Sequence, residues 1–245
     1  MYSDMTFEAP GTYNKADKGV PTWAAKASKA GLSQSQYFGM VKCIDDNVGK
    51  LITCLRDNQL LDHTIIVFTS DHGDLRGEHH RHNKGVPLEA SAKIPFIVFY
   101  PNRIPEGSVV KNAFNTVDFS PAILSFMGQK IPSQMEGRDF SKLLIKPKQQ
   151  KNWEDITFLR NAGREDQGKW VAAVTSRYKL VLSVDNIPWL IDMENDPDEI
   201  INYIHHGEKA NVVKELARQL DNYARKYADP FLKGTKMAED LMSLL

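Results

Sequence analysis

The sequence has few cysteines, and the two that it has are poorly placed for a disulfide. Cys43 and Cys54 lie eleven residues apart in a stretch of helical periodicity. They therefore fall on different faces of one helix, too far apart along it to be bridged. We predict no disulfide framework, which leaves the redox compartment open. We interpret both cysteines as packing or surface residues.

The chain also lacks an excess of either charge and any long apolar run. Lys plus Arg and Asp plus Glu both number 31, so no net field recruits nucleic acid or an anionic membrane. The longest apolar stretches have about seven residues, whereas a membrane-spanning helix needs roughly 20. Residues 1–8 show neither the basic nor the apolar region of a secretion signal. We therefore predict neither a nucleic acid nor a membrane partner, and any anion recognition must be local.

What the sequence does have is an abrupt change of character within residues 64–84. An apolar, β-branched run at 65–68 stops at Asp71 and His72, and a polar loop ending at Lys84 follows. A run that is apolar on both faces predicts a strand inside a parallel sheet covered by helices on both sides. The carboxyl end of such a strand opens into the crevice where α/β folds bind ligands.

The residue types at this strand end suit metal and anion chemistry. The carboxylate of Asp71 and the imidazole of His72 are a combination that binds divalent cations. Lys84 adds a compact positive charge that could hold an anionic substrate or a leaving oxygen. The alternative is a solvated surface loop that happens to be rich in Asp and His, and spacing alone does not decide between the two.

The flanking segments predict further elements. Ser33 with Gln36 forms a capping-box pattern, and apolar residues at helical spacing predict a long amphipathic helix over 34–60. A second apolar run at 94–100 predicts another strand of the same sheet. Asp118 is expected to cap a short helix, with Pro121 in its first turn.

The C-terminal part changes to shorter extended pieces. Four segments predict a small antiparallel sheet: 156–160, 170–176, 178–183 and 189–192. An amphipathic helix follows, with apolar residues from Val212 to Tyr227 on one face. Together they predict a small α+β subdomain.

The motifs, taken in order, resemble one family. The segments that carry the resemblance are Tyr37–Leu61, Thr64–Asp74, Gly77–His79, Lys84, Ile94–Val98, Val117–Pro121, Glu136–Phe140, Tyr178–Leu180 and Asp196–Asn202. They resemble, over about residues 36–232, the C-terminal half of a type I sulfatase of the alkaline phosphatase superfamily. So many ordered matches are far more specific than an Asp-His pair.

The resemblance implies a fold and a domain division. It implies an alkaline-phosphatase-like α/β/α sandwich, with residues 1–148 as the C-terminal part of the catalytic α/β domain and its main sheet. Residues 149–245 would form a small α+β subdomain with an antiparallel sheet and a C-terminal helix. Members of this family are usually periplasmic, secreted or lysosomal, but nothing in the sequence locates this chain.

The resemblance also implies roles for individual residues. Asp71 and His72 fall on the family's second pair of metal ligands, usually for Ca²⁺, while Mn²⁺ or Zn²⁺ serves related phosphonate and phosphodiester hydrolases. Lys84 falls on the lysine that contacts the sulfate and the ester oxygen, where it would stabilise charge on the leaving alkoxide. His79 matches a frequent loop histidine that would orient the sulfate or the lysine, with a purely structural role as the alternative. His82 is expected at the substrate entrance, where basic groups would attract sulfated sugars.

Parts of the family's site are missing from the sequence. The nucleophile is a formylglycine made from the Cys or Ser of a Cys/Ser-x-Pro-x-Arg motif, and neither Cys43 nor Cys54 stands in one. The first metal-binding aspartates are also absent, so we expect the second half of a sulfatase, inactive alone.

The resemblance sets the expected partners and the alternatives. We expect a sulfated small molecule or carbohydrate as the substrate. We also expect either a missing N-terminal half as a partner or self-association through an exposed sheet edge. One alternative is a phosphodiester or phosphonate ester hydrolase of the same superfamily. The other is a non-catalytic fragment or binding partner.

Overall fold

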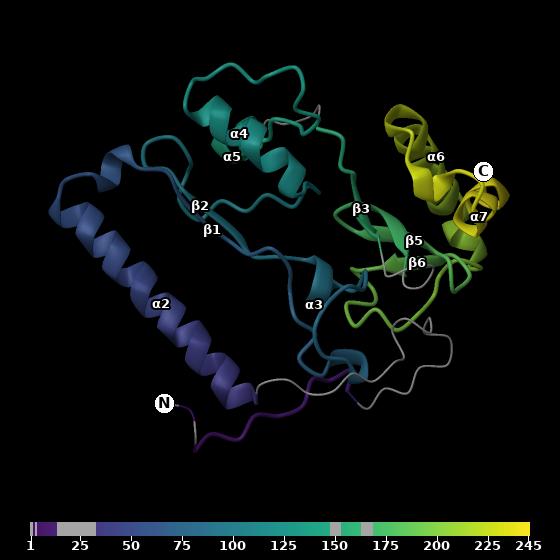
Figure 1. Ribbon diagram of the computed structural model, residues 1–245, viewed down its shortest axis with the longest axis horizontal. Coiled ribbons are helices and arrows are strands. Elements are labelled where there is room, and N and C mark those ends of the chain that lie inside the picture. Colours follow the sequence, from purple (N-terminus) through teal and green to yellow (C-terminus); the bar gives the residue numbers. More distant parts are fainter. Residues whose placement is uncertain (1, 3, 14–32, 148–152, 163–168) are drawn as a thin grey trace. The chain divides into compact units, whose positions relative to one another are not determined.

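The computed structural model describes residues 2, 4–13, 33–147, 153–162 and 169–245 (Figure 1). These residues form two compact units. The first is made chiefly of residues 33–84 and 88–104, and the second of residues 85–87 together with 105–245. The domain boundary predicted between 148 and 149 lies outside the described residues and stays a prediction. None of the described helices has the length and apolar character needed to cross a membrane.

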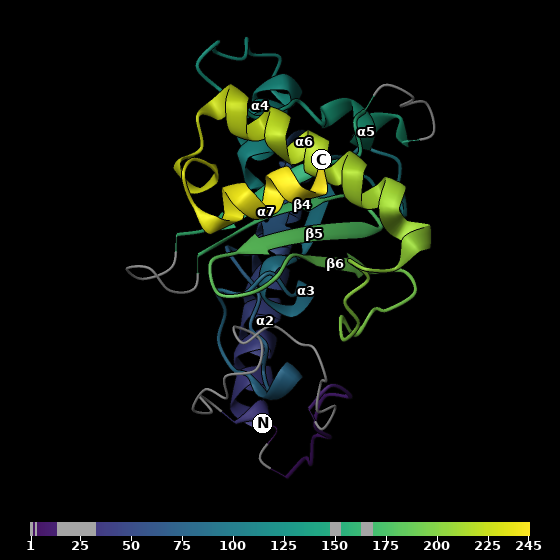
Figure 2. The same ribbon diagram turned by 90° about the vertical axis from the view of Figure 1, so that its right-hand side faces the viewer.

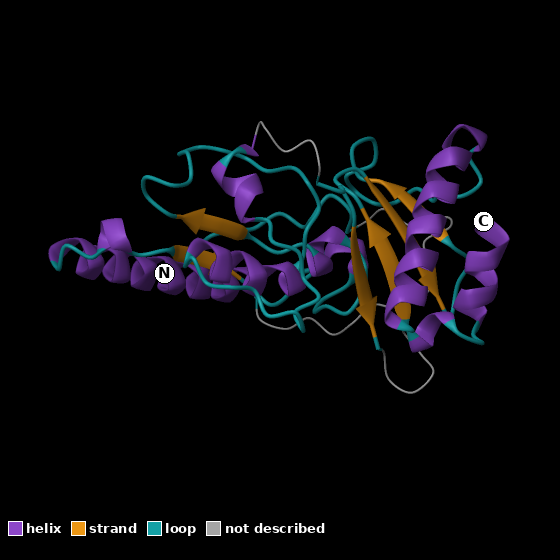
Figure 3. Cartoon of the chain, turned by 90° about the horizontal axis from the view of Figure 1, so that it is seen from above, coloured by secondary structure: helices purple, strands orange, loops and turns teal. Residues whose placement is uncertain are grey.

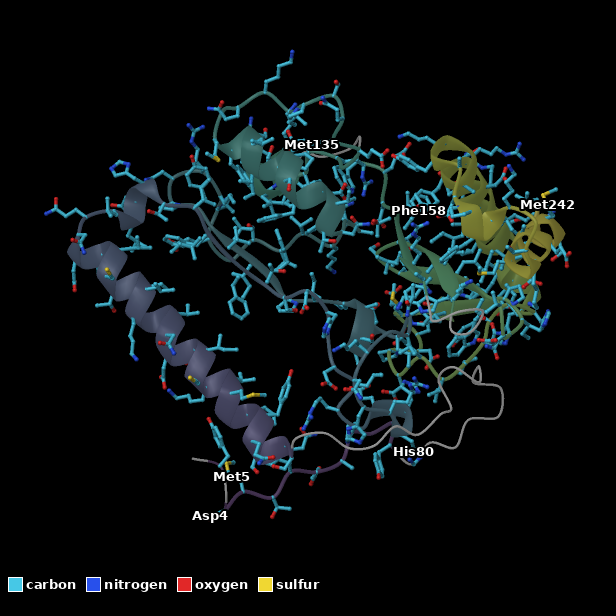
Figure 4. All side chains as sticks on the ribbon, in the orientation of Figure 1. Asp4, Met5, His80, Met135, Phe158 and Met242 are labelled. Atoms are coloured by element: carbon cyan, nitrogen blue, oxygen red, sulfur yellow. The ribbon has the colours of Figure 1, made fainter. Side chains whose placement is uncertain are left out.

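The first unit begins with the long predicted helix, α2 (Gln34–Asp57). Ser33 and Gln36 form the expected capping box, in which the Ser33 side chain accepts from the Gln36 amide and the Gln36 side chain accepts from the Ser33 amide. The helix is confirmed. However, none of its residues is buried, and its side chains project from the ribbon in Figure 4.

Both predicted strands of this unit are present, but their pairing differs from the prediction. Strand β1 (Ile66–Thr69) pairs with β2 (Phe96–Phe99) in antiparallel orientation, with Val67 opposite Val98. The predicted burial in a parallel sheet is wrong for this pair, because Phe68 and Ile97 are exposed. A parallel pair needs a crossover of a dozen or more residues, usually a helix. Among the described residues between the two strands, the only α-helix is the one-turn α3 (Glu89–Ala92).

In the second unit, Asp118 stands at the N-cap position of α4 (Phe119–Phe126), as predicted, but its carboxylate does not cap that helix. It accepts from the amide of Asn115 at 3.2 Å and from the amide and guanidinium of Arg138 at 2.7 and 3.2 Å. A Cβ on Gly137 would lie 1.9 Å from the carbonyl oxygen of Val117. Only glycine therefore allows Arg138 to approach, and α5 (Ser141–Ile145) follows.

The predicted C-terminal sheet is confirmed. Strands β3 (Thr157–Asn161), β4 (Trp170–Val174), β5 (Tyr178–Ser183) and β6 (Trp189–Asp192) form an antiparallel meander in sequence order. Two helices, α6 (Ala210–Tyr227) and α7 (Lys236–Leu244), cover one face of this sheet (Figures 2 and 3). The expected helix corresponds to α6, whereas α7 was not predicted, because its short run near the chain end gives little periodicity.

The core of the second unit lies between this sheet and the two helices. Its buried members are Ile156, Val171, Ala173, Leu180, Leu182, Leu190, Val213, Leu216, Ala217, Leu220, Met237 and Leu241. At its margin, Phe158 of β3, labelled in Figure 4, stacks on Tyr223 of α6 with ring centroids 4.5 Å apart. Leu180 and Leu182, two residues apart on β5, belong to this core, and one sheet face packed against one helix face is the usual basis of an α+β core.

Candidate active site at the end of strand β1

Asp71 and His72 lie directly after β1, at the strand end where the sequence placed them. The carboxylate of Asp71 is 84% exposed, and the side chain of His72 is 40% exposed. His72 Nδ1–H donates to the carbonyl oxygen of Gly73 at 2.8 Å, which leaves Nε2 as the free ring nitrogen. Nε2 lies 3.3 Å from Asp71 Oδ2. Two lone pairs that converge in this way are satisfied by a cation or a proton between them.

Gly73 allows the strand end to pack closely against α3. Its amide donates to the carbonyl oxygen of Ser91 at 2.9 Å. A Cβ at this position would lie 2.1 Å from the carbonyl oxygen of Ala90, so any larger residue would force the backbone apart. The glycine therefore fixes the direction in which the chain leaves Asp71 and His72.

The loop that follows is closed at its base by Asp74 and Asn83. Asp74 Oδ1 accepts from the amide of Asn83 at 3.0 Å, and the amide of Leu75 donates to the carbonyl oxygen of Asn83 at 2.9 Å. These bonds return the chain to the strand end. Lys84, the next residue, is thus brought back close to the segment that carries Asp71 and His72.

The closed loop is held in an unusual backbone conformation. Five of its residues have positive φ angles, namely Arg76, Gly77, His79, His80 and Asn83. Non-glycine residues seldom adopt this region, which costs of order 1 kcal/mol or more for each. Such strain persists only where the surroundings impose it, and it is concentrated at functional loops.

His79 lies inside the loop rather than on its surface. Its side chain is only 4% exposed, and its amide donates to the hydroxyl of Thr12 at 3.2 Å. His80, labelled in Figure 4, is exposed and lies against the ring of Tyr13, with centroids 4.7 Å apart. Of the two, His80 faces solvent, and His79 supports the loop from within.

The basic side chains of this loop differ in their exposure. Lys84 is exposed, and within the described ranges no ion pair involves it. His82 and Arg81 are half-buried, and burial lowers the pKa of the Arg81 guanidinium from its ordinary value. Lys84 is therefore an exposed cation of this loop that can turn toward an anion.

The sequence did not reveal the anchor between this loop and α2. Arg76 Nε and Nη2 both donate to Gln34 Oε1, at 3.3 and 3.2 Å, and Gln34 Nε2 donates back to the carbonyl oxygen of Arg76 at 3.2 Å. The guanidinium also lies 4.6 Å from the centre of the Tyr37 ring. Arg76 and Gln34 are 42 residues apart, and neither is unusual in its own segment, so nothing in the sequence indicated this contact.

The donor set at the strand end fits a metal ion only in part. Asp71 supplies a carboxylate oxygen and His72 the ring nitrogen Nε2, both convergent and accessible. Across the described part of the chain, however, no group of three or more His, Cys, Asp or Glu residues is placed to hold an ion. Ca²⁺ takes six to eight oxygen ligands. The two residues can therefore form one side of a metal site but cannot complete it.

Two family models match the chain. One is described as Sulfatase and matches residues 6–129. The other is described as N-sulphoglucosamine sulphohydrolase, C-terminal, and matches residues 77–226. Together they match residues 6–226, which include every predicted site residue.

Individual relatives agree with the family models. An arylsulfatase from Clostridium perfringens is 28% identical over 211 residues, which are 82% of this chain and 43% of the relative. An N-acetylglucosamine-6-O-sulfatase from Bacteroides thetaiotaomicron is 31% identical over 199 residues, 79% of this chain and 36% of the relative. The chain thus spans about two fifths of the length of these curated relatives.

A solved structure is similar to this chain. It is a complex of a protein with its substrate D-glucosamine-2-N,6-O-disulfate, and it aligns with a TM-score of 0.74 and 30% identity. The alignment covers 80% of this chain and 41% of that one.

Proposed function

The chain belongs to the sulfatase family, and from this premise we propose that its strand-end loop serves the hydrolysis of sulfate esters on carbohydrates. The family and the alkaline-phosphatase-like α/β fold predicted from the motifs are confirmed. By family the chain is a sulfuric ester hydrolase. The substrate class is supported by relatives that act on sulfated amino sugars.

One observation carries the proposal. The bonds between Asp74, Leu75 and Asn83 return the loop to the end of β1, which supports placing the candidate metal ligands Asp71 and His72 and the ammonium group of Lys84 at one strand end. A sulfate ester needs this combination, because negative charge must be held both on the sulfate oxygens and on the leaving oxygen.

Each predicted residue has a proposed part in this chemistry. The ammonium group of Lys84 would bind the sulfate and stabilise the charge that develops on the leaving alkoxide, an effect larger in the transition state than in the ground state. His79, being buried, would act through the loop that orients Lys84. His82 would line the approach for the sugar.

Asp71 and His72 would hold the divalent ion, for which Ca²⁺ is the proposal and Mn²⁺ or Zn²⁺ the alternatives. Once bound, such an ion neutralises sulfate charge and polarises its oxygens. The hydrogen bond from His72 Nδ1 to Gly73 keeps Nε2 free for this purpose. Since no Cys/Ser-x-Pro-x-Arg motif occurs in the sequence, the formylglycine nucleophile and the remaining carboxylates would come from the other half of a sulfatase.

The proposal predicts that the 245-residue chain alone does not hydrolyse a chromogenic aryl sulfate. Mixed with a separately produced N-terminal half of a sulfatase that carries the nucleophile, it should gain turnover. Lys84→Ala should then lower kcat by about 10²-fold or more, whereas Lys93→Ala, at an exposed lysine of the same unit, should not. Turnover by the chain alone that disappears in Asp71→Ala would contradict the proposal.

The same assay separates the related hydrolases. The Asp-His pair and Lys84 would suit a phosphate or phosphonate ester as well as a sulfate ester, because all three place negative charge on non-bridging oxygens. A chromogenic phosphonate monoester and a phosphodiester therefore accompany the sulfate. Faster turnover of either one would favour the phosphonate or phosphodiester alternative.

A second candidate function, a non-catalytic partner, is favoured by the surface of the first unit. Helix α2 exposes large apolar side chains, among them Ile44 at 53% and Leu51 at 66%, and Ile97 of β2 is 62% exposed. We propose that the occupant of this surface is the N-terminal α/β half of a sulfatase, since the chain spans only 36–43% of its relatives. Without that half, the same surface would support self-association.

A further inference from the structure

Residues 85–87 directly follow Lys84 and are held by three neighbouring strands of the C-terminal sheet. The carbonyl oxygen of Gly85 accepts from Asn161 Nδ2 of β3 at 2.5 Å and from Trp170 Nε1 of β4 at 3.0 Å. The carbonyl oxygen of Pro87 accepts from Lys179 Nζ of β5 at 2.7 Å. Three side chains from consecutive strands thus fix both ends of a three-residue segment.

The segment is also confined sterically. Val86 is only 4% exposed, and Pro87 is buried. Gly85 has a φ of +96°, and a Cβ there would lie 3.3 Å from Asn161 Nδ2. A side chain at this position would therefore be strained and would displace a hydrogen-bond donor, so the backbone conformation just after Lys84 has little freedom.

Lys179 is itself fixed by a buried ion pair. Its ammonium group lies 2.9 Å from Glu199 Oε1, and the two side chains are 0% and 4% exposed. Removing two charges from water costs several kcal/mol each, and an apolar pair of the same volume is often as stable or more so. The pair is therefore poorly explained by stability alone. What an apolar pair could not do is donate a hydrogen bond to Pro87.

Glu199 is held in place by the turn that contains it. Its φ of +52° is rare for a side chain of this kind. On one side, Asp196 Oδ2 accepts from the amide of Ile201 at 2.8 Å. On the other, Asn202 Oδ1 accepts from the amide of Leu190 at 3.0 Å, which joins the turn to β6. The turn Asp196–Asn202 thus holds the Glu199 carboxylate in the position where it pairs with Lys179.

We propose that Asn161, Trp170 and Lys179 are positioning residues for Lys84. They hold the main chain one residue beyond the catalytic lysine, as the Asp74–Asn83 bonds hold it one residue before. Because a displacement of about 1 Å can cost of order 10²-fold in rate, both sides need to be fixed. This inference rests on the proposed role of Lys84 in sulfate ester hydrolysis.

The first test uses amide hydrogen exchange of the full chain, which does not depend on activity. Trp170→Phe removes the indole donor to Gly85 and keeps an aromatic ring. The loss of one hydrogen bond, net about 0.5–1.5 kcal/mol, should speed exchange in residues 84–88 by about 3- to 10-fold. The matched control is Trp153→Phe, which removes an indole bond of the same kind to the carbonyl oxygen of Ala113 and should leave this segment unchanged.

A second variant covers the buried pair. Lys179→Met alone would leave the Glu199 carboxylate buried without its ammonium partner, so it is combined with Glu199→Met, which removes both charges together. This double variant should fold and show the same faster exchange in 84–88. Unchanged exchange in both Trp170→Phe and the double variant would overturn the inference.

The second test measures kinetics after the chain is combined with an N-terminal sulfatase half. Trp170→Phe should lower kcat about 10-fold with little change in KM, because Lys84 is displaced in the transition state and the substrate still binds. A purely structural role would alter the melting temperature without this separation of kcat from KM. Faster exchange together with an unchanged kcat would overturn the positioning role.

Failure of the proposed function can be distinguished from failure of the positioning inference. If the wild-type assembly shows no turnover of the aryl sulfate, the proposed function fails. The positioning of Lys84 is then decided by its acetylation rate, measured by mass spectrometry against that of Lys93 in the same sample. We expect the ratio to change about 3-fold or more in Trp170→Phe, by the same loss of one hydrogen bond. No change in the ratio would overturn the inference.

Discussion

Asp192, at the end of β6, has a carboxylate that is fully buried and strongly hydrogen-bonded. Arg177 Nε and Nη2 each donate to it at 3.0 Å, and Lys209 Nζ donates at 3.0 Å. Burial raises the pKa of this carboxyl, but the hydrogen bonds from Arg177 and Lys209 outweigh burial and hold the pKa well below its ordinary value of 3.8. The charged form is therefore the stable form in the folded protein.

The depressed pKa of Asp192 predicts a defined pH dependence of stability. A group whose folded pKa is lowered contributes stability that is fully present above its unfolded pKa, near 3.8, and is lost as pH falls toward the folded value. Asp192→Asn should lower the free energy of unfolding by about 3 kcal/mol at pH 7. The difference from wild type should shrink below pH 4, as measured by urea unfolding at several pH values.

The control for this prediction is Asp221→Asn. Asp221 pairs with Arg225 one turn away on the surface of α6, where such a pair contributes about 0.5 kcal/mol or less. It should leave both the stability and its pH profile nearly unchanged. A deficit in Asp192→Asn that is equally large at pH 3 and pH 7 would show that the charge of Asp192 is not responsible.

At the scale of single residues, the sequence pointed to candidate chemistry but not to tertiary contacts. Asp71, His72 and Lys84 were identified from residue type and from their position after an apolar run. The close approaches of backbone carbonyls to Gly73 and Gly137 were not predicted, because nothing in the sequence around a glycine shows whether another segment packs against it. Asp118 was assigned to the correct helix start, but its partner is Arg138, which lies 20 residues further along the chain.

At the scale of elements, local patterns predicted which segments form helices and strands but not which strands pair. Helix α2 and the four strands of the C-terminal sheet follow from periodicity and from turn residues between them. The antiparallel pairing of β1 with β2 does not follow from them, because an apolar run suits a parallel and an antiparallel strand equally. The pair is antiparallel, and the described residues between the two strands contain only a one-turn α-helix, too little for a parallel crossover.

The exposed face of α2 predicts self-association that substitution should remove. Because no residue of α2 is buried, changing Ile44 and Leu51 to Glu should alter the free energy of unfolding by no more than about 0.5 kcal/mol. The wild-type chain should form dimers or larger species at micromolar concentration, and the double variant should be monomeric. Light scattering coupled to size-exclusion chromatography measures both.

Ile187→Glu is the control for the α2 variant. Ile187 is also 60% exposed but belongs to the second unit, so it should not alter the association. A monomeric wild-type chain would contradict the prediction. So would a double variant that associates as strongly as wild type.

At the scale of the whole molecule, the proposed division into 1–148 and 149–245 can be tested by isolating the second part. Every buried residue of its core cluster lies between Ile156 and Leu241, so residues 149–245 should fold alone with a cooperative thermal transition. They should be less stable than the same region in the full chain, because Lys179 loses the carbonyl of Pro87. Circular dichroism during heating measures the transition.

A core variant shows whether that transition reports the sheet and its helices. Leu190 is fully buried in β6, and Leu190→Ala should cost about 2–5 kcal/mol. A transition that does not move in this variant would not arise from the core. Broad, non-cooperative melting of residues 149–245 would contradict the proposed domain boundary.

The sequence alone determined the family, helices α2 and α6, the strands and the candidate site residues. All of these depend on residue type, on periods of two or 3.6 residues, or on ordered motifs, which are local properties of a chain. Only the tertiary structure decided the antiparallel pairing of β1, the partners of Asp118 and the anchoring of residues 85–87. Gly85 and Asn161 are 76 residues apart, and no local pattern specifies such a contact. It depends on packing that forms only when distant segments fold together.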